Sequence, residues 1–222
     1  MKRRSFVKTS ALGGTALGLG GLGLQSCNLG RKKHLTILHT NDVHSHIDPF
    51  PSRHHRFPNL GGVSRRAALI EAIRRENPNT LVLDAGDIFQ GTPYFNFYGG
   101  ELEFKLMNKM GYRASTLGNH DFDNGLNGLL AQLPNAEFSF LCANYDFRNT
   151  VLDGYIKPYE VYVIDGIRVG VFGLGVQLKG LVLEELYGET TYLNPVEIGQ
   201  DMARTLREEE NCDLVICLSH LG

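Results

Sequence analysis

Four polar clusters in this chain carry residue types that bind divalent metal ions. Their carboxylate, imidazole and amide groups are hard-to-borderline oxygen and nitrogen donors, which suit zinc, manganese or iron better than a thiolate site does. Two such ions roughly 3.5–4 Å apart can generate hydroxide near neutral pH and clamp an in-line displacement at phosphorus. The sequence therefore indicates a site for divalent metal ions. The clusters are Asp42-Val43-His44, Asp84-Ala85-Gly86-Asp87, Gly118-Asn119-His120-Asp121 and Ser219-His220.

Each cluster follows a short apolar run that we predict to be a β-strand. Open α/β sheets bind their ligands at the carboxyl ends of the strands, so clusters far apart in sequence would meet in one crevice. Asp84, which directly ends one of these runs, is expected to be structural rather than a ligand. The predicted strands cover residues 35–39, 80–83, 114–117 and 213–218.

Amphipathic segments alternate with these strands. Residues 61–76, 102–110, 125–133 and 196–210 have helical periodicity, and residues 138–143 are predicted to form a further strand. Asp165-Gly166 lies between two apolar runs, which is a strong β-hairpin signal. Strands alternating with helices, together with one hairpin, predict an α/β sandwich with mixed sheets.

The four clusters, in this order, resemble the motifs of the calcineurin-like metallophosphoesterases, specifically the 5′-nucleotidase branch. The resemblance begins near Leu35, runs to the last residue, and implies a metallophosphoesterase-type sandwich. It also implies two divalent ions (zinc, manganese or iron) and release of phosphate from nucleotides by a metal-bridging hydroxide. The matching stretches are HTNDVHSH at 39–46, DAGDIFQG at 84–91, GNHDFDNG at 118–125 and LSHLG at 218–222.

The resemblance also implies a role for each matching residue. Asp42 and His44 would bind the first ion, and Asp87 would bridge both ions. Asn119, through its side-chain oxygen, and His220 would bind the second ion.

Two further residues of the third motif would act on the substrate. His120 would not bind a metal; it would face the substrate phosphate and stabilise or protonate the leaving group. Asp121 would orient His120 by a hydrogen bond, as acidic residues do for working histidines.

The chain departs from the family pattern at its end. The family completes its site with a G-H-x-H pair beyond the position of His220, whereas the H-x-H of this chain is His44-Ser45-His46. We therefore expect residues 34–222 to be a catalytic domain that is incomplete at its C-terminus. A sugar-nucleotide or cyclic-nucleotide phosphoesterase, or a non-catalytic lipoprotein that binds a metal or ligand, remains an alternative.

The first residues have the pattern of an export leader. Lys2, Arg3, Arg4 and Lys8 precede a glycine-rich apolar run, which is typical of a secretory signal and resembles a twin-arginine one. We expect residues 1–26 to be removed before Cys27, which would carry a lipid; a plain signal peptide is the alternative. The protein would then be periplasmic or lipid-anchored in the cell envelope of a bacterium.

The charge balance limits the range of partners. The 222 residues carry a formal net charge of −2, which argues against a nucleic-acid binder that neutralises phosphates with a basic face. A small phosphoester, most simply a nucleotide, is the expected partner, and membrane contact is expected only through a lipid on Cys27.

Overall fold

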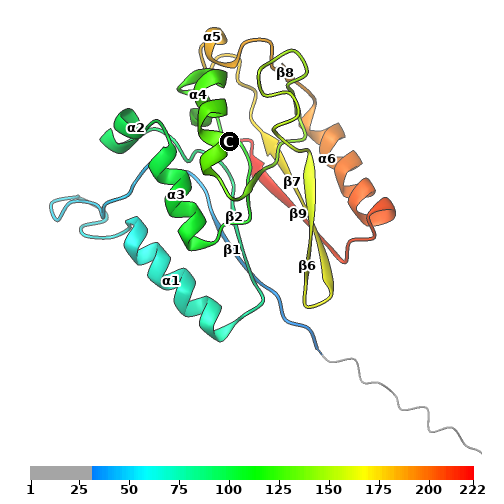
Figure 1. Cartoon of the computed structure of the whole chain (residues 1–222), viewed down its shortest axis with the longest axis horizontal. Coiled ribbons are helices and arrows are strands. Elements are labelled where there is room, and N and C mark those ends of the chain that lie inside the picture. Colours follow the sequence, from blue (N-terminus) through cyan, green and yellow to red (C-terminus); the bar gives the residue numbers. More distant parts are fainter. Residues whose placement is uncertain (1–31) are drawn as a thin grey trace, which may run out of the picture. The chain divides into compact units, whose positions relative to one another are not determined.

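Two β-sheets, one of them parallel and the other mixed, form the centre of the fold (Figure 1). The computed structural model describes residues 32–222, so the expected leader and Cys27 lie outside the described residues. The first sheet is parallel, with the strand order β1-β2-β3-β4. Its strands are β1 (Thr36–Thr40), β2 (Thr80–Asp84), β3 (Ala114–Ser115) and β4 (Ser139–Phe140).

The second sheet is mixed and has the order β6-β7-β9. β6 (Tyr159–Ile164) and β7 (Ile167–Gly175) form the predicted hairpin, and both turn residues between them have positive φ. β9 (Leu214–His220) pairs with β7 in parallel, which places His220 opposite Gly175 at the carboxyl end of the sheet. A separate pair joins β5 (Tyr145–Asp146) and β8 (Thr191–Tyr192).

Helices cover the outer faces of the two sheets (Figure 1). On the side of the first sheet lie α1 (Val63–Glu76) and α3 (Glu101–Met110), and on the side of the second lies α6 (Pro195–Arg204), which continues into a π-turn. The remaining helices are α2 (Pro93–Tyr98), α4 (Gly125–Gln132) and α5 (Glu184–Tyr187), and short 3₁₀ turns occupy His120–Phe122 and Leu133–Asn135.

Three clusters of buried side chains fill the interfaces between these layers. β2 shows how one strand serves two of them, because successive side chains of a strand point to opposite faces. Val82 packs in the cluster under α1 and α3, whereas Leu81 and Leu83 pack between the two sheets. β2 is thus buried on both faces, which explains its continuous apolar run.

Several elements differ from the sequence-based expectation. The strands predicted at 114–117 and 138–143 pair over only two residues each, and the helix Pro93–Tyr98 was not predicted. Within residues 32–222, none of the helices has the length and apolar character needed to cross a membrane.

Candidate metal centre

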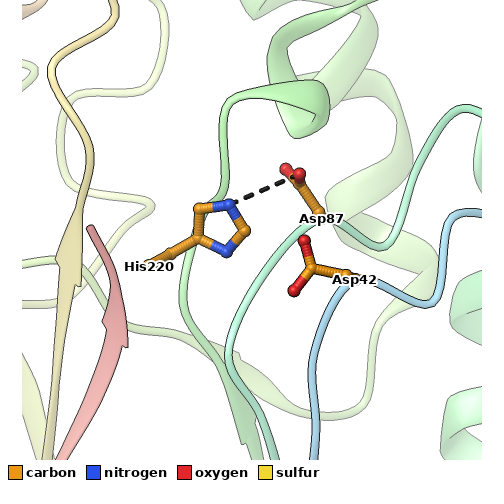
Figure 2. A group of neighbouring side chains, drawn as sticks. All are labelled: Asp42, Asp87 and His220. Atoms are coloured by element: carbon orange, nitrogen blue, oxygen red, sulfur yellow. Dashed lines mark ion pairs between the residues drawn. The ribbon is translucent and has the colours of Figure 1, made fainter. Parts of the chain in front are cut away.

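Three of the expected metal ligands meet at the carboxyl ends of the strands. Asp42 follows β1, Asp87 follows β2, and His220 ends β9. One potential ligand atom from each lies within 4.8 Å of the other two, and Figure 2 shows the three side chains turned toward one another. The His220 Nε2 is 3.3 Å from Asp87 Oδ2. The order of the sheets therefore brings together residues that are up to 178 positions apart.

His44 lies beside the same group. Its Nε2 is 3.8 Å from Asp42 Oδ1 and 3.8 Å from Asp87 Oδ2, so Asp87 lies between two imidazoles. This is the position that a carboxylate shared by two ions would need.

Both histidines turn Nε2 toward the carboxylates because their other ring nitrogens are engaged. His44 Nδ1 lies 3.2 Å from the carbonyl oxygen of Phe89, and His220 Nδ1 lies 2.8 Å from that of Ala85. A carbonyl oxygen only accepts, so Nδ1 carries the proton in each ring. In the neutral ring the lone pair is then on Nε2. Metal-binding histidines commonly have this arrangement, in which the other ring N–H donates to an oxygen and so leaves the ligating nitrogen unprotonated.

The backbone is strained at these residues. Asp42, His44 and Asp87 have φ values of 50°, 44° and 58°, in the left-handed region that non-glycine residues rarely adopt. Hydrogen bonds between the two loops hold them there, with Asp42 N–H donating to Gly86 O at 2.9 Å and His44 N–H donating to Asp87 O at 3.1 Å. Such strain persists where the surroundings enforce it, and it is concentrated at functional sites.

Two glycines allow the loops to approach this closely. A Cβ on Gly118 would lie 2.1 Å from Asp87 Oδ1, and one on Gly86 would lie 2.6 Å from the backbone nitrogen of Gly118 and 3.0 Å from His220 Nδ1. Any side chain at these positions would push the ligands apart.

His120 lies against Asp87 from the third loop. The backbone N–H of His120 donates to Asp87 Oδ1 at 2.8 Å, and the His120 ring packs edge-on against His44 with 5.3 Å between ring centroids. Asn119, half-buried, is the adjacent residue. His44 and His120 therefore lie beside the group formed by Asp42, Asp87 and His220.

The expected role of Asp121 is wrong. Its buried carboxylate does not bind the His120 ring; it accepts backbone N–H groups that hold two loops together. The residue beside His120 is Asp123, whose Oδ2 is 3.1 Å from His120 Nδ1. Asp121 accepts from Asp87 at 3.0 Å, Ile88 at 2.9 Å, Phe89 at 3.3 Å and Gly118 at 2.8 Å.

A second support that sequence reasoning missed lies beneath His44. The buried Ser45 hydroxyl donates to the buried carboxylate of Glu103 and lies 2.9 Å from the hydroxyl of Thr92. Ser45 and Glu103 are polar residues inside otherwise apolar surroundings, but no local sequence pattern pairs them across 58 positions.

The charges of Asp87 and His220 depend on each other. Burial raises the pKa of Asp87, but hydrogen bonds from His220 and from the His120 N–H outweigh it, so the net pKa is lowered. Burial lowers the pKa of His220, but the hydrogen bond and charge of Asp87 raise it to about 9 overall. Asp87 and His220 therefore each favour the charged form of the other.

Two more deeply buried acids have raised pKa values, in contrast to Asp87. Burial raises the pKa of Asp84 to about 6 despite hydrogen bonds from Thr40, Gly86 and Ser115. Burial, with the charge of Asp87 next, raises the pKa of Asp121 to about 7. Both oxygens of Asp84 accept hydrogen bonds from these neighbours, which agrees with the structural role expected for this residue.

This fold and this group of residues define a metallophosphoesterase-type domain. Residues 35–222 match the family model of calcineurin-like phosphoesterases, and the chain belongs to that family.

Within the family, the chain is similar to 5′-nucleotidases. It is 39% identical to the 5′-nucleotidase of Rattus norvegicus over 204 residues, which cover 85% of this chain and 34% of the relative. The crystal structure of a 5′-nucleotidase precursor from Thermus thermophilus superposes with a TM-score of 0.77 at 38% identity, over 85% of this chain and 37% of that one. This likeness confirms the predicted α/β fold with mixed sheets.

The structure of the NAD nucleotidase of Haemophilus influenzae is also similar, with 32% identity and a TM-score of 0.73. It is matched over 85% of this chain and 34% of its own length. The chain thus spans about a third of the length of the relatives it matches.

Proposed function

We propose that this chain carries catalytic residues of a metal-dependent phosphoester hydrolase that releases phosphate from nucleotides. The observation that carries the proposal is the convergence of Asp42, Asp87 and His220 within 4.8 Å, next to His44 and His120. The relatives named 5′-nucleotidase and NAD nucleotidase favour nucleotides as the substrate class.

The donor set fits two divalent ions of the zinc, manganese or iron type. Asp42 and His44 would hold one ion, Asn119 and His220 the other, and Asp87 both. Such ions, when bound, supply hydroxide near neutral pH and neutralise charge on the phosphoryl oxygens. The fit rests on the two Nε2 lone pairs that face the carboxylates, since a lone pair is what a cation requires.

His120 would donate a proton to the leaving group. Asp123 accepts the Nδ1 proton of His120, which fixes the ring orientation and leaves Nε2 as the nitrogen available to the substrate. A proton held at Nε2 could pass to the oxygen that leaves phosphorus, in the manner of a general acid. Asp123, rather than Asp121, takes the orienting role in this proposal.

The test is phosphate release from a nucleoside monophosphate by the full product of the gene, with manganese or zinc supplied. Asp87→Ala and His120→Asn should each lower the rate by about 100-fold or more. As a matched control, His54→Asn in the loop at 51–57 should leave the rate unchanged. Metal binding without phosphate release by the wild-type protein would instead support a non-catalytic binding protein.

The leader is part of the same proposal. A protein exported through residues 1–26 and lipid-modified on Cys27 would meet nucleotides outside the cytoplasm. Cells grown with a radiolabelled fatty acid should label the wild-type protein but not Cys27→Ser. Label on both proteins, or on neither, would contradict the lipid anchor.

A further inference from the structure

The chain enters the domain at the amino ends of the strands, at the opposite end from the metal centre. Lys33 Nζ donates to the carbonyl oxygen of Gly166, in the turn between β6 and β7, at 2.8 Å. The side chain of Asn79, the residue before β2, donates to the carbonyl oxygen of His34 at 3.2 Å, and its own carbonyl accepts from the N–H of Thr36 at 2.9 Å. A segment that precedes Lys33 therefore joins the domain at this end.

The same end of the domain carries exposed basic side chains. A helix that connects two parallel strands runs back against them, so α1 and α3 end beside the amino ends of β2 and β3. Both helices have basic residues in the last turn, where cations are favourable. Arg74 Nη2 donates to the carbonyl oxygen of Met110 at 2.9 Å, which joins the two helix ends. The exposed basic residues here, named the basic face below, are Lys33, Arg75, Lys109 and Arg113.

The charge of the basic face is not neutralised by its neighbours. None of the ion pairs among residues 32–222 includes a member of the face. Together with Arg74, the four members outnumber the exposed acids nearby, which are Glu76, Glu137 and Asp165. The whole chain has a formal net charge of −2, so this end is a local excess of positive charge.

Arg113 lies where the basic face is hollowed. Two cavities of about 590 and 390 Å³ adjoin there and share Arg113, Tyr162, Gly111 and Glu160. The guanidinium carbon of Arg113 is 5.3 Å from the centroid of the Tyr162 ring. Val163, which is 63% exposed, lines the larger cavity. A cation on an aromatic ring beside an exposed apolar side chain suits the boundary between lipid headgroups and acyl chains.

The side of this end formed by β9 has the opposite charge. Glu208 and Glu209 lie in the π-turn after α6, and Glu210 and Asp213 lie between that turn and β9. An anionic surface would therefore attract the side of α1 and α3 and repel the side of β9. This asymmetry favours one orientation of the domain on such a surface.

We propose that the basic face docks on the anionic surface of a phospholipid bilayer and that the metal centre faces away from it. This inference rests on the lipid anchor proposed for Cys27. Cys27 is six residues before Lys33, a stretch that spans at most about 20 Å, so a lipid on Cys27 would keep this end of the domain at the membrane. β7 connects the two ends and is about 30 Å long, so the metal centre would meet nucleotides in the surrounding solution.

Vesicle binding by the full product of the gene carrying Cys27→Ser tests the face without a lipid. The vesicles are phosphatidylcholine, either alone or with about one third phosphatidylglycerol. The protein should prefer the anionic vesicles, and added salt should weaken that preference because it screens exposed charges. Equal binding to both kinds of vesicle would overturn the proposal.

The sharpest variants are Arg113→Gln and Lys109→Gln in this Cys27→Ser parent. Each should weaken binding to anionic vesicles about fivefold, the contribution of one basic residue near such a surface. Arg113→Lys keeps the charge and should bind as the parent does. Arg207→Gln is the matched control, because it removes an exposed charge from the acidic side of the same end. The leader is the same in all these proteins, so it does not affect the comparison.

Melting temperatures show whether each of these variants has folded. An equal loss of vesicle binding in Arg207→Gln and Arg113→Gln, or no loss in either, would overturn the proposal.

Quenching by brominated acyl chains measures the orientation on the anionic vesicles. The 222 residues contain no tryptophan, so Val163→Trp and Phe97→Trp each add a reporter, and the fluorescence of the parent is subtracted. Both positions are exposed, Val163 beside the basic face and Phe97 on α2, which follows the loop of Asp87. The reporter of Val163→Trp should be quenched and that of Phe97→Trp should not. Equal quenching of both, or quenching of Phe97→Trp alone, would overturn the proposal.

The outcome separates this inference from the lipid anchor. If the wild type takes up no fatty-acid label but the Cys27→Ser protein prefers anionic vesicles through Arg113, the anchor fails and the docking face stands. If the wild type is labelled at Cys27 but Arg113→Gln binds vesicles as Arg207→Gln does, the docking face fails alone.

Discussion

The carboxylate of Asp121 accepts the backbone N–H of Asp87 at 3.0 Å, so a fully buried acid fixes the loop that carries the carboxylate expected to be shared by two ions. The same carboxylate also accepts from Gly118, which belongs to the loop of Asn119 and His120. Asp121 thereby ties the second motif to the third. The position of the site therefore depends on an acid whose two oxygens both accept backbone N–H groups.

Asp121→Asn should destabilise the fold. Both oxygens of Asp121 accept backbone N–H groups, whereas an asparagine offers one oxygen and turns an NH₂ group toward the remaining donors. Leaving such buried donors unsatisfied costs about 1–3 kcal/mol each, so we expect a loss of about 2–4 kcal/mol in the free energy of unfolding. Urea denaturation of the two proteins measures it. A difference below about 0.5 kcal/mol would show that Asp121 does not hold the loops.

Asp123→Asn should lower the rate of phosphate release and leave the stability of the fold unchanged. Asp123 is partly exposed and contacts the His120 ring at 3.1 Å, so its replacement should leave the free energy of unfolding within about 0.5 kcal/mol. The rate of phosphate release should fall about 10- to 100-fold, since supporting partners of working histidines contribute on this scale. Steady-state kinetics at saturating metal measure the change. An unaltered rate in Asp123→Asn would remove Asp123 from the proposed mechanism.

The contrast between Asp121 and Asp123 also shows what the sequence could predict. The apolar runs and the polar clusters that follow them were enough to predict the fold class and the convergence of the clusters. The family resemblance then selected Asp42, His44, Asp87 and His220 within those clusters. Which acid contacts the His120 ring depends on the local backbone conformation. Residues 120–122 form a 3₁₀ turn. In that turn side chains at i and i+3 eclipse, so Asp123 lies next to His120 and Asp121 turns inward.

Longer-range supports were beyond sequence reasoning for a different reason. Ser45 and Glu103 are joined through the packing of α3 against the loop after β1, and Arg74 joins the end of α1 to the end of α3. These relationships arise from tertiary contacts. The local sequence around each of these residues predicts only an ordinary loop or helix. A periodicity argument finds the helix but not which of its polar side chains contacts a neighbouring element.

Asp84 should make stability fall as the pH rises from about 4 to about 6. Its pKa is raised from 3.8 to about 6 on folding, so between these values the folded state binds the proton more tightly than the unfolded state does. The contribution is fully favourable below pH 3.8 and is lost as the pH passes 6. Roughly two pKa units correspond to about 3 kcal/mol.

Asp84→Asn should remove this pH dependence while keeping the buried contacts. The asparagine oxygen can accept from Gly86 and Ser115, and its NH₂ group can donate to the Thr40 hydroxyl, which also lies 2.8 Å from that of Tyr112. The difference in unfolding free energy between variant and wild type, measured at pH 4 and pH 7, should therefore favour the variant by more at pH 7. An equal difference at both pH values would mean that Asp84 does not titrate in this range.

Divalent metal should stabilise the protein through Asp87. A cation that binds the folded state alone adds about 2.7 kcal/mol to the free energy of unfolding at 100 times its dissociation constant. Because Asp87 lies within 3.8 Å of both His44 and His220, Asp87→Asn should weaken binding at both expected ion positions and abolish most of this gain. Asp153→Asn removes one exposed carboxylate away from the site and should respond to manganese as the wild type does. Thermal unfolding with and without manganese measures all three proteins. The Asp87→Asn protein must itself unfold cooperatively without manganese for the comparison to hold. If manganese raises its melting temperature as much as that of the wild type, the ion binds somewhere other than between Asp42, Asp87 and His220.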